Sequence, residues 1–322
     1  MRGRVSTWVG WWVAIGGLAM AFAASPTLGQ CPADICDCLG EAGQFDIVTD
    51  ELAAKSGKVS GGGESYRIGA LVGASVCATV GKLAGRLEGE AEIGENLILA
   101  APSGVAVTFK GYQEYGVPSP GVFIEGDLLS GGGSIAGAEY GLVAGTTDTT
   151  GTAPEVDECE QAQSDAASAS AALAALPATQ TIPGLTVENQ MTANIDAGPG
   201  VNVIAIGDLV LKPQKITGYA YGSYLSINLD PLTTSVIINI SGKLAVGSYC
   251  EITIDGGDVE DVIINVTGAK PTVKIKTGAY IAPAVLAPGR KLLVGSVAFT
   301  ANLYGKKTTL KGTEVSETLL CP

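Results

Sequence analysis

Four acids in one short segment are the residues best suited to chemistry: Asp255-Gly-Gly-Asp258-Val-Glu260-Asp261. Paired carboxylates can hydrolyse a glycosidic bond when the fold holds them at a suitable separation. Carboxylate oxygens also bind calcium, although this segment lacks the spacing of a known calcium loop. Because most such clusters are solvated turns, we expect a turn here and keep Asp255, Asp258 and Asp261 as calcium candidates.

Histidine is absent from the chain, which excludes Ser-His-Asp and Cys-His catalysis. We therefore expect a protein that is not an enzyme and that needs no cofactor.

The cysteines are the second reactive group: Cys31, Cys36, Cys38, Cys77, Cys159, Cys250 and Cys321. Cys36-Asp-Cys38 is one residue too short for a Cys-x-x-Cys motif, and mixed Cys/His zinc sites need the missing histidine. All seven are therefore candidates for structural disulfides, as expected in an exported protein. Their odd number leaves one thiol free or paired with another molecule.

The amino terminus is typical of a secretory signal peptide, with Arg2 and Arg4 followed by an uncharged run from Val5 to Gln30. We expect residues 1–30 to be removed after bacterial-type export, which places the mature chain outside the cell or on its surface. A retained anchor of about 20 apolar residues is the alternative. The mature chain has 17 basic and 32 acidic residues, a formal charge of −15, which disfavours nucleic-acid binding.

Two segments 26 residues apart carry one strand pattern, Ser235-Val-Ile-Ile-Asn-Ile-Ser-Gly242 and Asp261-Val-Ile-Ile-Asn-Val-Thr-Gly268. In an extended strand alternate side chains share a face, so Val236, Ile238 and Ile240 point one way and Asn239 the other. We predict that the segments stack in register, with Asn239 and Asn265 joined by their amides. Both asparagines also match the N-glycosylation pattern, but the repeat favours the amide ladder.

Short apolar segments between glycines recur on both sides of residues 152–177 without a fixed period. This pattern predicts a mainly β fold, a β-solenoid with rungs of unequal length. We expect one domain, with residues 31–151 as its amino-terminal part, residues 152–177 as a flanking helix and residues 178–322 as its carboxyl-terminal part.

The expected helix begins at Thr152-Ala-Pro-Glu155, which has the spacing of a capping box. Apolar residues three or four apart continue from Val156 to Leu176, and Pro177 ends the pattern. Ser164, Ser168 and Ser170 fall on the rest of the helix surface. We expect its small apolar side chains to cover the outward side chains of the solenoid, Ile237 and Ile263 among them.

Four segments resemble a known family: Leu173-Ala-Ala-Leu-Pro-Ala-Thr179, Gly200-Val-Asn-Val203, the string at 236–242, and Ala284-Val-Leu-Ala-Pro288. In these segments the chain is similar to the choice-of-anchor A family of exported bacterial proteins. The resemblance covers residues 155–312 and implies an ice-binding-like β-solenoid outside the cell, often attached by a carboxyl-terminal sorting signal. No such signal follows Gly312, so we expect free secretion or an association through Cys321.

These observations lead us to expect a secreted or cell-surface adhesion protein that binds extracellular matrix, a glycan or a cell-surface component, or associates with itself. One alternative is an ice-binding protein, which needs threonines at the same place on several rungs. The threonines of Thr146–Thr152 are instead clustered in one loop. The other alternative, a carbohydrate-active enzyme on a β-helix, needs acids that converge in a groove.

Overall fold

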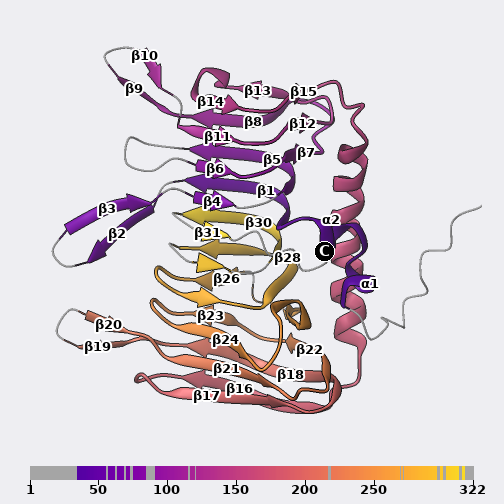
Figure 1. The fold of residues 1–322 in the computed structure, drawn as a ribbon, viewed down its shortest axis with the longest axis vertical. Helices are drawn as coiled ribbons and strands as arrows, with labels where there is room; N and C mark the ends of the chain where they lie inside the picture. The colour runs from indigo at the N-terminus through magenta and orange to yellow at the C-terminus, as the bar shows by residue number, and fades with distance from the viewer. Residues whose placement is uncertain are drawn as a thin grey trace, which may run out of the picture.

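The computed structural model describes residues 35–55, 57–61, 64–68, 70–72, 75–84, 91–114, 117–119, 121–216, 219–268, 270, 272–295, 298–299, 302–311 and 314–315. Their strands wind into one elongated β-solenoid, and a long helix runs along its side (Figure 1). The predicted fold class, a mainly β solenoid with a flanking helix, is confirmed. The proposed signal peptide, Cys31 and Cys321 lie outside the described residues.

The described residues form a 15-stranded sheet in which all neighbours are parallel. Its members are β1 (Ile47–Lys55), β5 (Val76–Ala84), β7 (Leu97–Leu99), β8 (Val105–Lys110), β12 (Leu128–Ser130), β13 (Ser134–Ala136), β15 (Thr147–Asp148), β16 (Gln180–Val187), β18 (Gly200–Leu211), β22 (Thr233–Ile240), β23 (Leu244–Val246), β25 (Val262–Val266), β26 (Thr272–Ile275), β28 (Ala284–Val294) and β30 (Leu303–Lys311).

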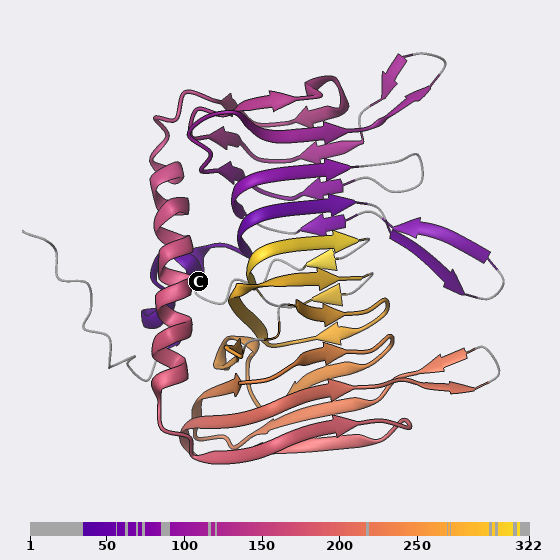
Figure 2. The same ribbon diagram turned by 180° about the vertical axis from the view of Figure 1, so that it is seen from behind.

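A 10-stranded parallel sheet closes the column on another side. It contains β4 (Ala70–Val72), β6 (Ala91–Ile93), β11 (Val122–Ile124), β14 (Gly141–Val143), β17 (Thr192–Ala197), β21 (Tyr224–Leu229), β24 (Glu251–Asp255), β27 (Tyr280–Ile281), β29 (Ala298–Phe299) and β31 (Glu314–Val315). Antiparallel hairpins project from the edge far from the long helix (Figure 2). They are β2 (Gly57–Gly61) with β3 (Glu64–Ile68), β9 (Tyr112–Glu114) with β10 (Val117–Ser119), and β19 (Gln214–Ile216) with β20 (Tyr219–Tyr221).

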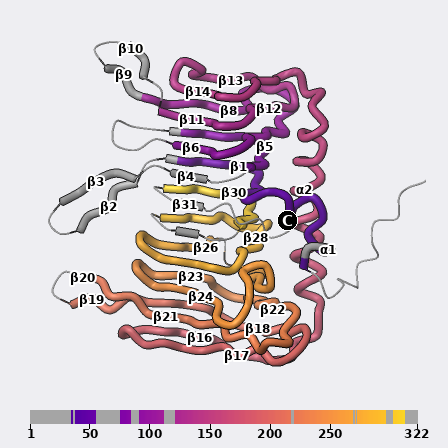
Figure 3. The backbone as a smooth tube through the Cα atoms, in the orientation of Figure 1, coloured from indigo at the N-terminus to yellow at the C-terminus, as the bar shows by residue number. Residues whose placement is uncertain are grey.

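The chain enters this column in the middle. From β1 successive rungs extend to β14 and β15 at one end of the column. The helix α2 (Pro154–Ala175) then runs along the side of the column to its other end (Figure 1). There β16 and β17 begin a second series, which returns until Leu303 of β30 pairs with Ile47 of β1. The first and last rungs therefore close one continuous column, and their colours meet in Figure 3.

The long strands of the first sheet bend at a corner, so the sheet forms two faces. Their amino-terminal halves, with β7, β12, β22 and β25, lie beneath α2, and we call this part the helix face. Their carboxyl-terminal halves, with β8, β13, β23 and β26, form what we call the lysine face. The second sheet is the third side of the column, here called the acidic face.

The twin segments behave as the alternation predicts. Val236 pairs with Val262 and Ile240 with Val266, so the two rungs stack in register. Val236, Ile238 and Ile240 are buried inside the column, whereas Ile237 and Ile263 point outward into the cluster that α2 covers. Each such fully buried aliphatic side chain contributes roughly 1.5–3 kcal/mol relative to exposure.

A repeated Gly-Asp pair fixes two corners of the column. The Asp127 carboxylate accepts a hydrogen bond from the backbone N–H of Thr146 at 2.6 Å, and the Asp208 carboxylate accepts one from Lys243 at 2.7 Å. In both places the donor follows a glycine of the next rung, Gly145 or Gly242. A Cβ at either glycine would lie 2.6 Å from a backbone oxygen of the preceding rung, so only glycine lets the rungs stack this closely.

Short helical turns complete the described structure: α1 (Ile35–Leu39), η1 (Gly40–Gln44), η2 (Ala138–Tyr140) and η3 (Val259–Asp261). The first two pack on α2, where the backbone N–H of Glu41 donates to the Asp165 carboxylate at 3.2 Å. In the part of the chain that the structure describes, no helix has the length and apolar content needed to span a membrane.

The amino-terminal cap of α2 differs from the capping-box prediction. Ala153 is the N-cap and Pro154 is the first helical residue, because its fixed φ suits that position. The Thr152 hydroxyl lies one residue too early and instead forms a hydrogen bond of 2.8 Å with Thr150. The apolar pattern is otherwise confirmed, since Val156, Cys159, Ala162, Ala166, Ala169 and Leu173 are all buried.

Candidate binding faces

The helix face is held to α2 by the predicted amide ladder. The Asn265 side-chain amide donates to the Asn239 side-chain oxygen at 2.8 Å, which confirms the predicted bond between the twin rungs. Asn265 also donates to the Ser170 carbonyl at 2.9 Å, and Asn239 donates to the Leu173 carbonyl at 2.8 Å. The two amides therefore join neighbouring rungs to each other and to the helix backbone.

Ser170 corrects the prediction that the three serines of the helix lie outside its buried apolar face. Ser164 and Ser168 are exposed, but Ser170 is buried and its hydroxyl donates to the Asn265 side-chain oxygen at 2.6 Å. A buried hydroxyl needs a partner, and the ladder supplies it. Apolar spacing alone could not identify this contact, since the signal is the asparagine repeat 95 residues away.

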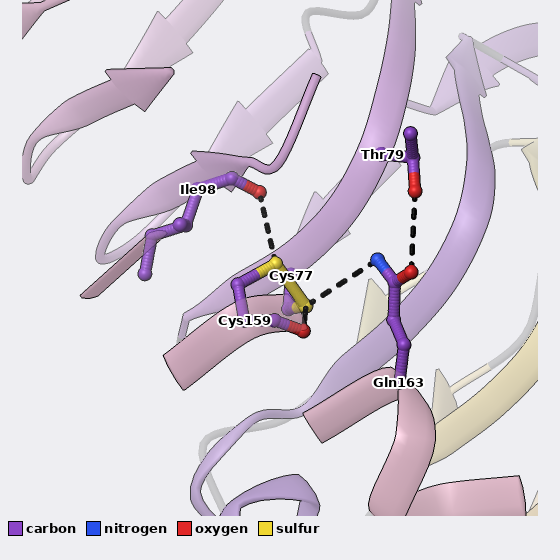
Figure 4. Close-up of a disulfide and its surroundings, with 5 residues drawn as sticks. All are labelled: Cys77, Thr79, Ile98, Cys159 and Gln163. Atoms are coloured by element: carbon purple, nitrogen blue, oxygen red, sulfur yellow. Dashed lines mark hydrogen bonds between the residues drawn. A yellow bond between two sulfur atoms is a disulfide. The ribbon is translucent and has the colours of Figure 1, made fainter. Parts of the chain in front are cut away.

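A disulfide between Cys77 of β5 and Cys159 of α2 joins the amino-terminal rungs to the helix (Figure 4). Next to it the Gln163 amide lies 3.8 Å from the Cys77 sulfur and accepts a hydrogen bond of 3.2 Å from the Thr79 hydroxyl. The disulfide prediction is confirmed for this pair. Cys38 is disulfide-bonded as well.

Cys250 is a correction to the set of disulfide candidates. It is a free, buried thiol between β23 and β24, and its sulfur accepts a hydrogen bond of 3.4 Å from the backbone N–H of Ser223. Burial raises the pKa of the Cys250 thiol. The side chain fills the interior of the column as a small apolar group, which is a common role for a free cysteine.

The acidic segment 255–261 is a turn between β24 and β25, as predicted. The backbone N–H of Asp258 donates to the Asp261 carboxylate at 3.3 Å across the η3 turn, so one of these acids serves the turn itself. Among the described residues, no group of three or more acids or cysteines is placed to hold a metal ion. The structure therefore gives Asp255, Asp258 and Asp261 no common site, and calcium binding there stays a prediction.

Lysines dominate the outward side of the lysine face. Neighbouring rungs place Lys307 between Glu51 and Lys291, and Lys274 lies in register with Leu293. Lys82 and Lys110 extend the basic surface over the amino-terminal rungs, and both are exposed. No single motif predicts this surface, because residues from positions 51 to 311 meet there only through the stacking of rungs.

Glu51 is an acid within this basic surface. It forms an ion pair with Lys307, and the hydrogen bond from Lys307 lowers the pKa of the Glu51 carboxyl. The charges of Lys307, Lys82 and Lys291 act in the same direction. Three lysines therefore surround one carboxylate, and the local charge remains positive.

The acidic face has the opposite character. Asp196, Asn228 and Asp255 follow one another in register on β17, β21 and β24. The Asn228 amide donates to Asp196 at 2.7 Å, so this row is ordered by its own hydrogen bonds. Glu251 lies on the same strand as Asp255, and Glu92 lies on β6 of the same sheet. The two faces that α2 leaves uncovered thus differ in the sign of their charge.

Clefts lie beside α2, where β28 bulges between Ala287 and Lys291. One has a volume of about 310 Å³ and is lined by Asp50, Gln163 and Lys306 among others. Burial raises the pKa of the Asp50 carboxyl, and the nearby Lys306 opposes that effect. The lining belongs mostly to the seam between helix and sheet, and a single partly buried acid does not form the carboxylate pair of a glycosidase.

A family model described as "Putative Ice-binding-like adhesive domain" matches residues 41–316. The chain belongs to this family. The predicted membership in an ice-binding-like β-solenoid family is thereby confirmed, and the choice-of-anchor A designation stays a prediction. No curated protein sequence matches the chain.

Solved structures similar to this ice-binding-like adhesive domain include three ice-binding proteins. The protein of Antarctomyces psychrotrophicus is 15% identical, with 87% of this chain and 97% of that chain covered and a TM-score of 0.42. The glycosylated protein of an Arctic yeast is 16% identical, with coverages of 87% and 94% and a TM-score of 0.42. The Shewanella frigidimarina domain is 14% identical, with coverages of 87% and 97% and a TM-score of 0.35.

Proposed function

We propose that this chain is an extracellular adhesion domain, whose rigid solenoid presents two flat charged faces to a glycan, matrix or cell-surface component. Its action is surface complementarity without turnover. The observation that carries the proposal is the in-register arrangement of charged side chains on both uncovered faces. The adhesive description of the family supports it, and the signal-peptide pattern of residues 1–30 supports a location outside the cell.

The physical basis of such adhesion is preorganisation. In-register rungs hold the side chains of neighbouring strands about 4.8 Å apart, so a partner meets a fixed array. Binding to a fixed array costs less conformational entropy than binding to flexible loops. The disulfide and the amide ladder keep α2 on the helix face, which leaves the lysine face and the acidic face open.

The binding test uses the oxidised mature chain, residues 31–322, against an array of glycans and matrix proteins. Adhesion predicts saturable binding to at least one class of surface component, and binding should disappear after thermal unfolding. A mature chain that is folded but binds no component of the array would contradict the proposal.

Ice binding is the second candidate function, and the description of the family favours it. The central outward row of the lysine face reads Lys82, Ala53, Thr309, Leu293 and Lys274 in successive rungs, which is not a row of threonines. Charged ammonium groups in such a row hold their own hydration water strongly. We therefore expect no thermal hysteresis from the mature chain. A clear thermal hysteresis would make ice binding the better assignment.

A further inference from the structure

We propose that the lysine face binds a linear anionic polysaccharide of the polyuronate type, laid along the column. This inference rests on the proposed adhesion function and names its ligand class. It follows from the separation of charge, the stacking of like charges, the spacing between lysines and an aromatic ring at the edge of the face.

Charge separation is the first observation. The mature chain has a formal charge of −15, yet one of its three sides is basic. Lysines outnumber the acids on this side, where Glu51 pairs with Lys307, Glu188 pairs with Lys212 at 3.0 Å, and Asp208 accepts a hydrogen bond from the backbone N–H of Lys243. The net field of the face therefore attracts anions, while the acidic face and the first turn of α2, with Glu155 and Asp157, repel them.

Stacking of like charges is the second observation. Lys291 and Lys307 occupy the same position on neighbouring rungs, about 4.8 Å apart along the column. Like charges directly opposite one another weaken a sheet. Glu51 offsets part of this repulsion, and a row of carboxylates bound along the face would offset the rest. The side chains between the lysines are short or neutral, such as Ala53, Thr309 and Ala245, so a polymer can lie close to the sheet.

The spacing between lysines favours a polysaccharide over nucleic acid. Along this face a lysine occurs every one or two rungs, or about 5–10 Å. Duplex DNA carries one charge per about 1.7 Å of its axis, far denser than the face can match, and it would be repelled by the acidic sides of the molecule. A polyuronate carries one carboxylate per sugar, a spacing close to that of the rungs.

An exposed tyrosine borders the same face. Tyr249 lies in the turn between β23 and β24, is 40% exposed and has a φ of 60°, which is unusual for a residue with a side chain. Its backbone N–H donates to the Thr277 carbonyl at 3.2 Å, next to Lys276, and its ring lies against Gly278. An exposed aromatic ring at the edge of a basic face suits a charged sugar, because the ring can pack on the C–H face while a lysine of the face pairs with the carboxylate.

The test measures binding of the oxidised mature chain to immobilised alginate, with dextran as the neutral polysaccharide and duplex DNA as the competing polyanion. We compare the variant Lys274→Glu/Lys291→Glu with the control Lys215→Glu/Lys270→Glu. Both variants change the net charge by the same amount, but Lys215 lies on the β19–β20 hairpin and Lys270 lies in the loop before β26. Circular dichroism and Tm confirm that each variant is folded.

We expect alginate binding that weakens as salt is raised, and a loss of about tenfold or more in the lysine-face variant with little change in the control. Tyr249→Ala should weaken binding to alginate but leave the salt dependence intact. Equal losses in both double variants would show an effect of net charge alone and overturn the inference. DNA binding as tight as alginate binding would overturn it too.

Two further outcomes separate this inference from the adhesion proposal. Binding to a neutral glycan or a matrix protein that neither double variant weakens would leave adhesion standing and remove the lysine face as the site. Concentration-dependent self-association that only the lysine-face variant abolishes, without alginate binding, would assign the face to the acidic side of a second copy instead.

Discussion

The helix face and the lysine face share their long strands, but the outward side chains are buried on the helix face and accessible to solvent on the lysine face. In β28 the outward residues Ala284 and Leu286 are buried under α2, whereas the outward Lys291 of the same strand lies on the lysine face. On each side of the bulge between Ala287 and Lys291 the strand alternates inward and outward side chains, so the difference between the two halves lies in what covers them. Covered outward positions are apolar or hydrogen-bonded, whereas the uncovered ones carry lysines separated by short or neutral side chains. The following predictions test whether stability belongs to one face and binding to the other.

The largest effect on stability is expected from the disulfide. Cys77→Ala/Cys159→Ala opens a loop that spans 82 residues, and a crosslink of that length contributes about 4.5 kcal/mol in the chain-entropy model. Chemical denaturation of the oxidised proteins measures the loss. If the double variant unfolds at the same denaturant concentration as the unmutated chain, the disulfide between α2 and β5 does not stabilise the helix face.

Leu173→Ala is the next largest change. Leu173 is fully buried on the covered side of α2, and truncating such a leucine costs about 2–5 kcal/mol. The matched control is Leu142→Ala, because Leu142 is 52% exposed on β14. We expect the control to change the unfolding free energy by less than about 0.5 kcal/mol. Equal effects at the two leucines would contradict the burial of this helix side.

The sequence predicted the helix face far better than the lysine face, for a physical reason. Val236, Ile237 and Asn239 repeat within 26 residues in Val262, Ile263 and Asn265, so local alternation predicts both the stacking and the cover. The lysine face has no local signature, since Lys307 meets Glu51 only because the last rung closes on the first. Ser170 and Thr152 were misjudged, and Cys250 could not be identified as a free thiol, because the contacts of all three are set by tertiary packing. Spacing along the chain does not contain that information.

Asn265→Ala should have a moderate effect. Asn265 is fully buried, and its loss leaves the Ser170 hydroxyl and the Asn239 side-chain oxygen without their partner, at a cost of about 1–3 kcal/mol. Asn194→Ala is the control, because Asn194 is exposed on β17 of the acidic face. Thermal unfolding should separate the two variants by several degrees. An Asn265 variant as stable as the Asn194 variant would show that the ladder does not hold the helix.

The smallest expected effect is on the reactivity of the Cys250 thiol. Because burial raises its pKa, the thiolate fraction at pH 8 is lower in the folded chain than in the unfolded chain. We expect slow reaction with a disulfide reagent in the native protein, faster reaction as the pH is raised, and rapid reaction after unfolding. The variant Cys250→Ser lacks this thiol and therefore shows which part of the labelling comes from Cys250. Rapid labelling of native Cys250 at pH 8 would mean that the interior of the column opens there.

The most direct test measures Tm and alginate binding together for Asn265→Ala and for Lys274→Glu/Lys291→Glu. The division between the two faces predicts a crossed result. The asparagine variant loses Tm and keeps alginate binding below its unfolding temperature, while the lysine variant keeps its Tm and loses binding. If both variants lose both properties, or if the lysine variant still binds alginate as tightly as the unmutated chain, stability and binding are not divided between the helix face and the lysine face.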